Sequence, residues 1–378
     1  MELDRWARDR LAKGWAPAAA GNAAAGEAGG DKAARVTAKV WVGAGAGAGR
    51  SHCQRRRPTR RTRTSRVKRL TPMKLAIASG KGGTGKTTVA TNLAVTLARH
   101  GRSVAYVDCD VEAPNGHLFL KPAITREVPV ERFVPRVNPA LCLHCGICAE
   151  KCRFHALVSL SDRTLVYEEL CHSCGGCGLN CPSGAITEES HPMGVVKTGA
   201  TGPVQFVSGT IHVGEANCPP VIRAAKHAAP PADWTILDAP PGTACPMIET
   251  VRDCDYLVLV TEPTPFGRHD LRLALEVAQD LKRPCGVVIN RAQSGANEAR
   301  DACAQARVPV LAEIPDALAV AQAYSQGRLA VEVVPELRAA FDQLLHRLFA
   351  EAAALTRSDP ASVDLISAPH LSANFSAS

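Results

Sequence analysis

Short apolar runs alternate with longer stretches of helical periodicity from residue 73 onward. The short runs are continuously apolar, which is typical of strands in a sheet that helices cover on both faces. Strands are predicted at 74–78, 104–108, 234–238, 257–261, 286–290 and 308–314. Helices are predicted at 86–100, 219–229, 268–282, 295–306, 316–326 and 335–354. This alternation predicts an α/β fold with a doubly wound, mainly parallel sheet.

The alternation stops after Asn115 and resumes near residue 191, with two short strand-like pieces around 195–197 and 205–213. The interrupting segment is rich in Pro and Cys, so we interpret it as a small inserted domain. The expected organisation is a discontinuous main domain of 73–115 and 191–355, an inserted domain of 116–190, and tails of 1–72 and 356–378. Gly/Ala repeats and like-charged blocks in the first tail predict disorder there, and the Ser/Pro/Ala-rich second tail is expected to fray.

Charge is distributed unevenly along the chain. The formal net charge is +8, yet residues 1–72 hold 17 Lys or Arg against 5 Asp or Glu, so the remaining 306 residues are mildly acidic. Nucleic-acid binding is therefore not expected of the main domain. The basic tail has three interpretations: a nucleic-acid arm, a transit peptide, or translated sequence upstream of the true start. Its early acidic residues disfavour the transit peptide, and Met73, just before the first predicted strand, favours an over-extended start or an inert tail.

The segment between the first predicted strand and helix fits a phosphate-binding loop. Gly80, Gly85, Lys86 and Thr87 match the pattern G-x-x-x-x-G-K-[ST], in the strand–helix context that this motif requires. Backbone N–H groups of such a loop point at phosphate oxygens, Lys86 is expected to reach the β- and γ-phosphates of ATP, and Thr87 is expected to ligate Mg²⁺. The expected nucleotide-binding residues here are Gly80, Gly82, Gly83, Thr84, Gly85, Lys86, Thr87 and Thr88. The same glycines satisfy a dinucleotide fingerprint, but Lys86 and Thr87 serve no purpose in binding NAD.

Acidic residues stand at the ends of two predicted strands. Asp108 and Asp110 close one strand, and Asp238 closes another. Such positions face the ligand crevice at the carboxyl edge of a parallel sheet. Asp238 is the expected partner of Mg²⁺ through water, and Asp110 is expected to position the attacking water.

Cysteine usage indicates metal chemistry. Fifteen cysteines without a signal peptide favour a reducing, cytoplasmic compartment over disulfides. Eight of them form two C-x₂-C-x₂-C-x₃-C runs, the spacing of two-cluster ferredoxins, in which the fourth Cys of each run ligates the other cluster. One 4Fe-4S cluster is expected on Cys142, Cys145, Cys148 and Cys181, and the other on Cys171, Cys174, Cys177 and Cys152. Zinc is the alternative, although structural zinc sites use paired C-x₂-C knuckles.

Residues 80–88 resemble the deviant phosphate-binding loop of the MinD/ParA/Mrp class of P-loop ATPases. Residues 108–110 and 238–243 resemble the switch I and switch II segments of that class, and residues 73–350 resemble its members that carry an inserted ferredoxin domain. The resemblance implies an ATP-sandwich homodimer in which Lys81 reaches the phosphates of the partner subunit. It also implies that Gly242 belongs to the nucleotide site and that Asn290 reads adenine.

Three functions follow from these features. The favoured one is an ATPase whose hydrolysis is coupled to electron transfer through both clusters, toward an unidentified redox partner. The alternative is an ATP-dependent carrier that passes iron–sulfur clusters to an acceptor protein, although the C-terminal C-x₂-C of Mrp-type carriers is missing here. A membrane-binding, MinD-like positioning ATPase is disfavoured, because the polar C-terminal tail supplies no basic amphipathic helix. No apolar run reaches about 18 residues, so no membrane span is expected.

Overall fold

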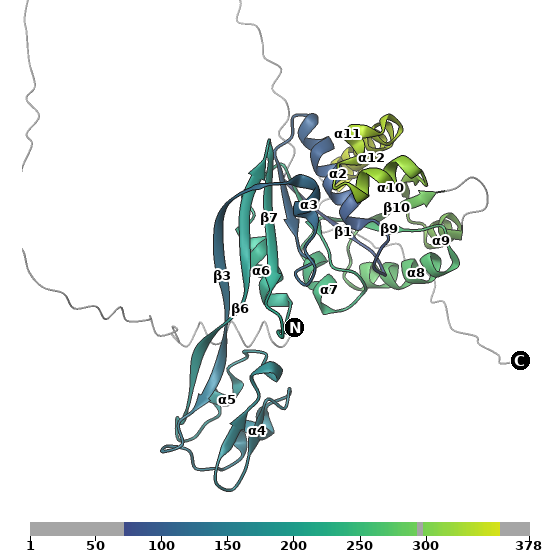
Figure 1. Cartoon of the computed structure of the whole chain (residues 1–378). Helices are drawn as coiled ribbons and strands as arrows, with labels where there is room; N and C mark the ends of the chain where they lie inside the picture. The colour runs from purple at the N-terminus through teal and green to yellow at the C-terminus, as the bar shows by residue number, and fades with distance from the viewer. Residues whose placement is uncertain (1–71, 293–297, 356–378) are drawn as a thin grey trace, which may run out of the picture. The chain divides into compact units, whose positions relative to one another are not determined.

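The computed structural model describes residues 72–292 and 298–355 (Figure 1). The predictions for the two tails lie outside the described residues, apart from residue 72. Within the described part, nine strands form one sheet in the order β11-β10-β9-β1-β8-β2-β7-β6-β3. Its parallel strands are β1 (Met73–Ala78), β2 (Val104–Asp108), β7 (Val204–Ile211), β8 (Trp234–Asp238), β9 (Tyr256–Thr261), β10 (Cys285–Ala292) and β11 (Val310–Pro315). The mainly parallel α/β sheet predicted from the sequence is confirmed.

Helices cover both faces of this sheet. One face is covered by α2 (Lys86–Arg99), α3 (Gly116–Leu120), α10 (Leu318–Ser325), α11 (Ala330–Val333) and α12 (Pro335–Leu355). The other face is covered by α6 (Pro219–Ala228), α7 (Cys245–Val251), α8 (Pro265–Asp280) and α9 (Glu298–Ala306). The predicted start of α9, at residue 295, falls outside the described residues. The short helices α3, α7 and α11 have no counterpart among the predicted elements.

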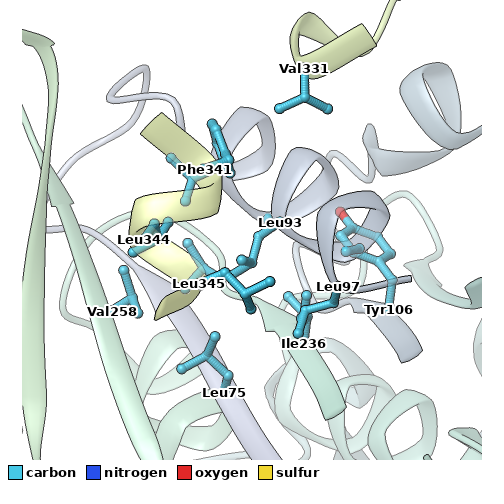
Figure 2. Packing of buried hydrophobic residues seen from close by; sticks show 14 of the residues in the cluster. Leu75, Leu93, Leu97, Tyr106, Ile236, Val258, Val331, Phe341, Leu344 and Leu345 are labelled. Atoms are coloured by element: carbon cyan, nitrogen blue, oxygen red, sulfur yellow. The ribbon is translucent and has the colours of Figure 1, made fainter. Parts of the chain in front are cut away.

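The two cores follow from the period-two alternation of strand side chains. On β1, Leu75 and Ile77 enter the core beneath α2 and α12, whereas Ala76 and Ala78 enter the opposite core. Figure 2 shows the first core, in which Leu93 of α2 and Leu345 of α12 pack over the sheet. Because both faces of each central strand are buried, the strands read as unbroken apolar runs in the sequence.

The strands β3 (Ala123–Val137) and β6 (Ile186–Thr201) form a long antiparallel pair that joins the sheet through β7. β3 lies in the segment where the alternation of apolar strands and helical stretches stops, and the sequence predicted only a short piece of β6. Most of the first half of β3 is exposed, and its sequence mixes Arg, Glu and Pro with apolar residues. A strand pair without a continuous buried face has no clear hydrophobic pattern, which explains why β3 was missed and only a short piece of β6 was predicted.

The segment between β3 and β6 carries the eight clustered cysteines on short elements (Figure 1). These elements are α4 (Ile147–Lys151), β4 (Leu157–Ser159), β5 (Thr164–Val166), the 3₁₀ helix η1 (Glu168–Leu170) and α5 (Gly176–Leu179). β4 and β5 pair with each other in a separate two-stranded sheet. No helix in the described residues is both long enough and apolar enough to cross a membrane.

Candidate functional site

The loop between β1 and α2 holds the predicted phosphate-binding residues in a strained, glycine-dependent conformation. Gly83 and Gly85 have φ values of 79° and 93°, in the left-handed region that favours glycine. A Cβ at Gly85 would lie 2.3 Å from the Nδ2 atom of Asn290. That amide donates a hydrogen bond of 2.8 Å to the carbonyl of Thr84. Asn290, which was expected to read adenine, thus holds the phosphate-binding loop from the end of β10.

A cavity of about 400 Å³ opens at this loop. Its lining includes Gly82, Gly83, Gly85, Lys86, Thr87, Thr88, Asp110, Asn290, Arg291, Pro315, Asp316 and Tyr324. The volume lies within the range of ordinary small-molecule sites. The cavity therefore brings together most of the predicted nucleotide-binding residues and the predicted water-positioning Asp110.

Other predicted residues lie next to the cavity rather than on its wall. Asp238 ends β8 beside β2, where its backbone is in register with Asp108. The amide of Gly242, in the loop after β8, donates a hydrogen bond of 3.2 Å to the carbonyl of Ser79, so this loop is tied to the start of the phosphate-binding loop. Thr84 is buried, and its hydroxyl oxygen has no hydrogen-bond partner in the described protein.

Burial dominates the electrostatics of this site. It lowers the pKa of Lys86, against the opposing effect of Asp238 and Asp110. It raises the pKa of Asp238 to about 6, while the hydroxyls of Tyr106 and Thr87 and the charge of Lys86 act in the other direction. Tyr106 donates a 2.8 Å hydrogen bond to Oδ2 of Asp238, whereas Oδ1 is buried without a partner of hydrogen-bond geometry. A buried carboxylate oxygen without a partner, beside Lys86 and Thr87, fits a water of hydrated Mg²⁺.

Asp108 and Asp110 differ in role although they are neighbours. The carboxylate of Asp108 accepts hydrogen bonds from the amides of Gly116 at 2.9 Å and Asp110 at 3.2 Å, so it holds the backbone after β2. Burial and the nearby Asp238 raise the pKa of Asp108 well above its usual range. Asp110 faces the cavity, and burial raises its pKa while Lys86 lowers it.

Lys81, expected to act across a dimer, is paired within its own chain. Its Nζ atom lies 3.3 Å from Oε2 of Glu262, and the other oxygen of Glu262 accepts a 2.6 Å hydrogen bond from Nη1 of Arg291. Glu262 follows β9 and is 8% exposed. Glu262 and Arg291 were given no site role from the sequence, although each directly follows a predicted strand, at 257–261 and 286–290, where side chains face the ligand crevice.

The eight clustered cysteines form two groups that cross between the runs. One cavity is lined by Cys142, Cys145, Cys148 and Cys181, called here the first cysteine set. A second cavity is lined by Cys152, Cys171, Cys174 and Cys177, called here the second cysteine set. In each set, three thiols come from one run and the fourth comes from the other. The structure thus brings together the same groups of four that the ferredoxin spacing predicts.

The two runs repeat the same backbone turns at a constant offset of 29 positions, the separation of Cys142 from Cys171. The residues with positive φ occur in equivalent pairs: His144 and Ser173, Gly146 and Gly175, and His155 and Gly184. Hydrogen bonds to sulfur repeat as well, since the amides of Ala156 and Ala185 each donate at 3.3 Å to the fourth Cys of their own run. Amide donors of this kind stabilise a thiolate and tune a bound cluster.

The donor set suits a polynuclear cluster, because four thiols line each of two small cavities. In a 4Fe-4S cubane, the thiolates bind separate irons and surround a volume. In the described residues, no group of three or more His, Cys, Asp or Glu side chains is arranged so that it could hold a metal ion. Burial raises the pKa of Cys177 to about 11 and also raises the pKa of Cys148 and Cys171. Against the effect of its burial, hydrogen bonds from Ser183 and from backbone amides lower the pKa of Cys181.

A phosphate-binding loop between the first strand and its helix, with acids at adjacent strand ends, defines a P-loop nucleotide-binding protein. More narrowly, the chain belongs to the CobQ/CobB/MinD/ParA nucleotide binding domain family, which matches residues 75–331. This family membership agrees with the resemblance found in the sequence. It covers the sheet and the nucleotide site, and it says nothing specific about the cysteines.

Individual relatives add detail. The protein MJ0579 of Methanocaldococcus jannaschii is 30% identical over 228 residues, which are 58% of this chain and 80% of that protein. An iron-sulfur cluster carrier protein of the same organism is 26% identical over 221 residues, 57% of this chain and 59% of the carrier. The structure of the septum site-determining protein MinD of Pyrococcus horikoshii, complexed with Mg-ADP, is 21% identical and covers 76% of this chain and 100% of its own, with a TM-score of 0.48.

Proposed function

We propose that this protein hydrolyses Mg-ATP and couples the reaction to electron transfer through two 4Fe-4S clusters. The carrying observation is the arrangement of the cysteines in two crossed sets, on a segment inserted between the nucleotide-site acids Asp110 and Asp238. We further propose that residues 116–190 act as an inserted ferredoxin-like domain. Elements between two switch segments are well placed to respond to the nucleotide state.

The nucleotide reaction converts ATP and water into ADP and phosphate, and the chain supplies a role for each step. Backbone amides of residues 80–88 and the α2 N-terminus hold the phosphates. Lys86 would neutralise charge on the β- and γ-phosphates, Thr87 and Asp238 would hold Mg²⁺, which would neutralise further phosphate charge, and Asp110 would orient the attacking water. Burial of these groups strengthens their electrostatic effect, because little water screens them.

For the redox half, the two cysteine sets would hold one cluster each. A 4Fe-4S cluster held there would supply one-electron transfer between a donor protein and an acceptor protein. The chain's own residues hold the cysteines and donate amide hydrogen bonds to their sulfurs, as Ala156 and Ala185 do. These contacts set the potential at which electrons are exchanged.

We propose a homodimer for the active state, with Lys81 contacting the phosphates bound by the partner subunit. In the isolated chain, Glu262 holds this lysine, so dimer formation would exchange one ionic partner for another. The family membership and the glycine-rich loop support this part of the proposal.

The test is a reconstitution of the full chain with iron and sulfide in the absence of oxygen. We expect about eight iron atoms per chain, a 4Fe-4S absorption and EPR signal, and a midpoint potential that shifts when Mg-ATP is added. About four iron atoms per chain, or stoichiometric zinc, contradicts the two-cluster assignment. Eight iron atoms with a potential that ignores ATP contradicts the coupling.

The second candidate function is an ATP-dependent iron–sulfur cluster carrier. Relatives named iron-sulfur cluster carrier protein favour it, although this chain spans 59% of the Methanocaldococcus jannaschii carrier. Incubation of the loaded protein with a cluster-free acceptor and Mg-ATP separates the two functions. Transfer of iron to the acceptor supports the carrier, and retention of iron with an ATP-dependent potential supports electron transfer.

A further inference from the structure

A partly buried ion cluster lies outside both candidate sites, where β3 and β6 approach the cysteine-bearing segment. Arg132 of β3 is 4% exposed and pairs twice with Glu215, from Nε to Oε2 at 2.9 Å and from Nη2 to Oε1 at 3.1 Å. His191 of β6 lies 3.3 Å from the same carboxylate and 3.3 Å from the carboxylate of Glu168. Neither nucleotide binding nor cluster ligation, as proposed above, uses these four side chains.

On one side, this ion cluster reaches the backbone of a cysteine ligand. Nη1 of Arg132 donates a hydrogen bond of 3.1 Å to the carbonyl of Glu168, and the amide of Cys171 donates to that same carbonyl at 2.9 Å. Phe133, the next residue of β3, lines the cavity of the second cysteine set. Arg132 is therefore in contact with the loop that carries the second set.

On the other side, the ion cluster reaches the segment that follows β2. The carbonyl of Val111, adjacent to Asp110, accepts a 2.9 Å hydrogen bond from the amide of Ile211 at the end of β7. The chain then turns within a few residues to Glu215, whose amide donates to the carbonyl of His212 at 3.2 Å. Movement of the backbone at Asp110 would thus be passed to the turn that carries Glu215.

We propose that the Arg132–Glu215 pair is a positioning link that couples occupancy of the nucleotide site to the second cysteine set, and so to the potential of the cluster held there. The inference rests on the proposed function. A guanidinium bound to a carboxylate through two parallel hydrogen bonds is rigid and direction-specific, so a shift of Glu215 displaces Arg132. Because the pair is buried, solvent and salt screen it little. The link would act on Cys171 through the shared carbonyl of Glu168.

The experiment compares the affinity of the loaded full-length protein for a Mg²⁺-bound, non-hydrolysable ATP analogue before and after reduction by dithionite, which supplies one electron per cluster. By linkage, the ratio of the two affinities measures the same coupling as the nucleotide-induced shift in potential, and a tenfold ratio equals about 59 mV for one electron. We expect a ratio of at least about fivefold in the unmodified protein, the lower end of typical allosteric coupling.

Glu215→Gln keeps the size of the side chain and loses its charge, and we expect it to reduce the ratio to below about twofold while iron stays near eight atoms per chain. Lys197→Gln is the control. It removes a cation of β6 that pairs with the exposed Glu127, outside the ion cluster, so its affinity ratio should match that of the unmodified protein. If Glu215→Gln loses its iron, Arg132→Lys replaces it, because lysine keeps the charge but not the two-pronged contact.

The outcomes separate the link from the function on which it rests. If the unmodified protein binds the ATP analogue with the same affinity before and after reduction, the proposed coupling itself is overturned. A normal ratio in the unmodified protein that persists in both Glu215→Gln and Arg132→Lys overturns the link alone. Cys142→Ser, which keeps the second cysteine set, should retain the ratio, and Cys171→Ser should lose it; the reverse result also overturns the link. Hydrogen exchange at the Cys171 amide should respond to the analogue in the unmodified protein and not in Glu215→Gln.

Discussion

At the residue scale, the nucleotide site is built from charges that the protein buries at a cost. Asp108 and Asp238 lie in register on adjacent strands, and Lys86 is buried close to Asp238. Burial without a bound nucleotide and Mg²⁺ leaves these charges incompletely compensated, which is typical of functional sites. Substitutions that remove these charges should therefore raise the stability of the protein and lower its activity.

Asp238→Asn should make the nucleotide-free protein more stable at neutral pH. The folded-state pKa of Asp238 is raised from 3.8 to about 6, so between these values the folded protein holds a proton that the unfolded chain has lost. The free energy of unfolding of the native protein thus falls as pH rises from about 4 to 6, by up to roughly 3 kcal/mol at 1.36 kcal/mol per pKa unit. Asparagine does not titrate, and it can still accept the Tyr106 hydrogen bond.

Denaturant unfolding at a series of pH values measures this difference. The variant should exceed the native protein in stability at pH 7.5, and the gain should vanish near pH 4. Asp280→Asn changes an exposed carboxylate of α8 and serves as the control, with no comparable gain. A gain of equal size at pH 4 and pH 7.5 contradicts the assignment.

Lys86→Ala should reduce ATP hydrolysis by at least about 100-fold, because removal of one preorganised donor to developing phosphate charge typically has this effect. The absorption spectrum of the clusters should not change, since Lys86 lies at the start of α2 and not among the elements that carry the two cysteine sets. A phosphate-release assay and a visible spectrum on the same sample make the comparison. Lys74→Ala, which removes an exposed partner of Asp253, should leave hydrolysis intact.

At the element scale, the sequence predicts buried strands well and exposed ones poorly. The runs at 104–108 and 234–238 match β2 and β8 residue for residue, because both faces of these strands are buried. β3 was missed because the exposed residues that dominate its first half impose no pattern. Motif spacing gave the cysteine sets, while the Lys81–Glu262 and Arg132–Glu215 pairs depend on tertiary contacts between distant segments, which spacing does not encode.

The crossed cysteine sets make a prediction that the linear order of the runs would not. Cys152→Ser changes the first run but should remove the cluster of the second set, so its residual EPR signal should match that of Cys171→Ser. Cys181→Ser should in the same way match Cys142→Ser. Each variant should retain about four iron atoms per chain, since the other set keeps its four thiols. Cys245→Ser, at an exposed cysteine of α7, is the control and should keep about eight. A match between Cys152→Ser and Cys142→Ser contradicts the crossing.

At the scale of the whole molecule, strand pairing brings the acidic residues of the nucleotide site together, although they are far apart in the sequence. β2 and β8 are adjacent and parallel, with Asp108 opposite Asp238, although the cysteine-bearing segment separates them in the chain. The pairing of β2 with β8 is therefore complete although the cysteine-bearing segment lies between them in the sequence. In the function proposed above, that segment adds electron transfer to a nucleotide-binding fold.

Glu262→Gln should favour association of two subunits in the presence of a non-hydrolysable ATP analogue. The substitution weakens the hold on Lys81, whose pair with Glu262 is partly exposed and thus worth about 0.2–1 kcal/mol. Each dimer contains two such pairs, so dimer affinity should rise by roughly up to thirtyfold. Sedimentation at saturating nucleotide measures it. Arg291→Gln should lower the dimer affinity, because Glu262 would then pair with Lys81 without a competing cation. Equal changes of dimer affinity in both variants contradict the inference that Glu262 holds Lys81.

The crossed cysteine sets also bear on how the protein is loaded with iron. Each cluster would link the two cysteine runs, because its ligands come from both. The first cluster to assemble would therefore bring the remaining four thiols close together and reduce the chain entropy lost when the second cluster forms. Loading should therefore be cooperative: at limiting iron and sulfide, native mass spectrometry should find mostly empty and fully loaded chains, with few that carry a single cluster. A cell would then contain chains that carry both clusters and chains that carry none.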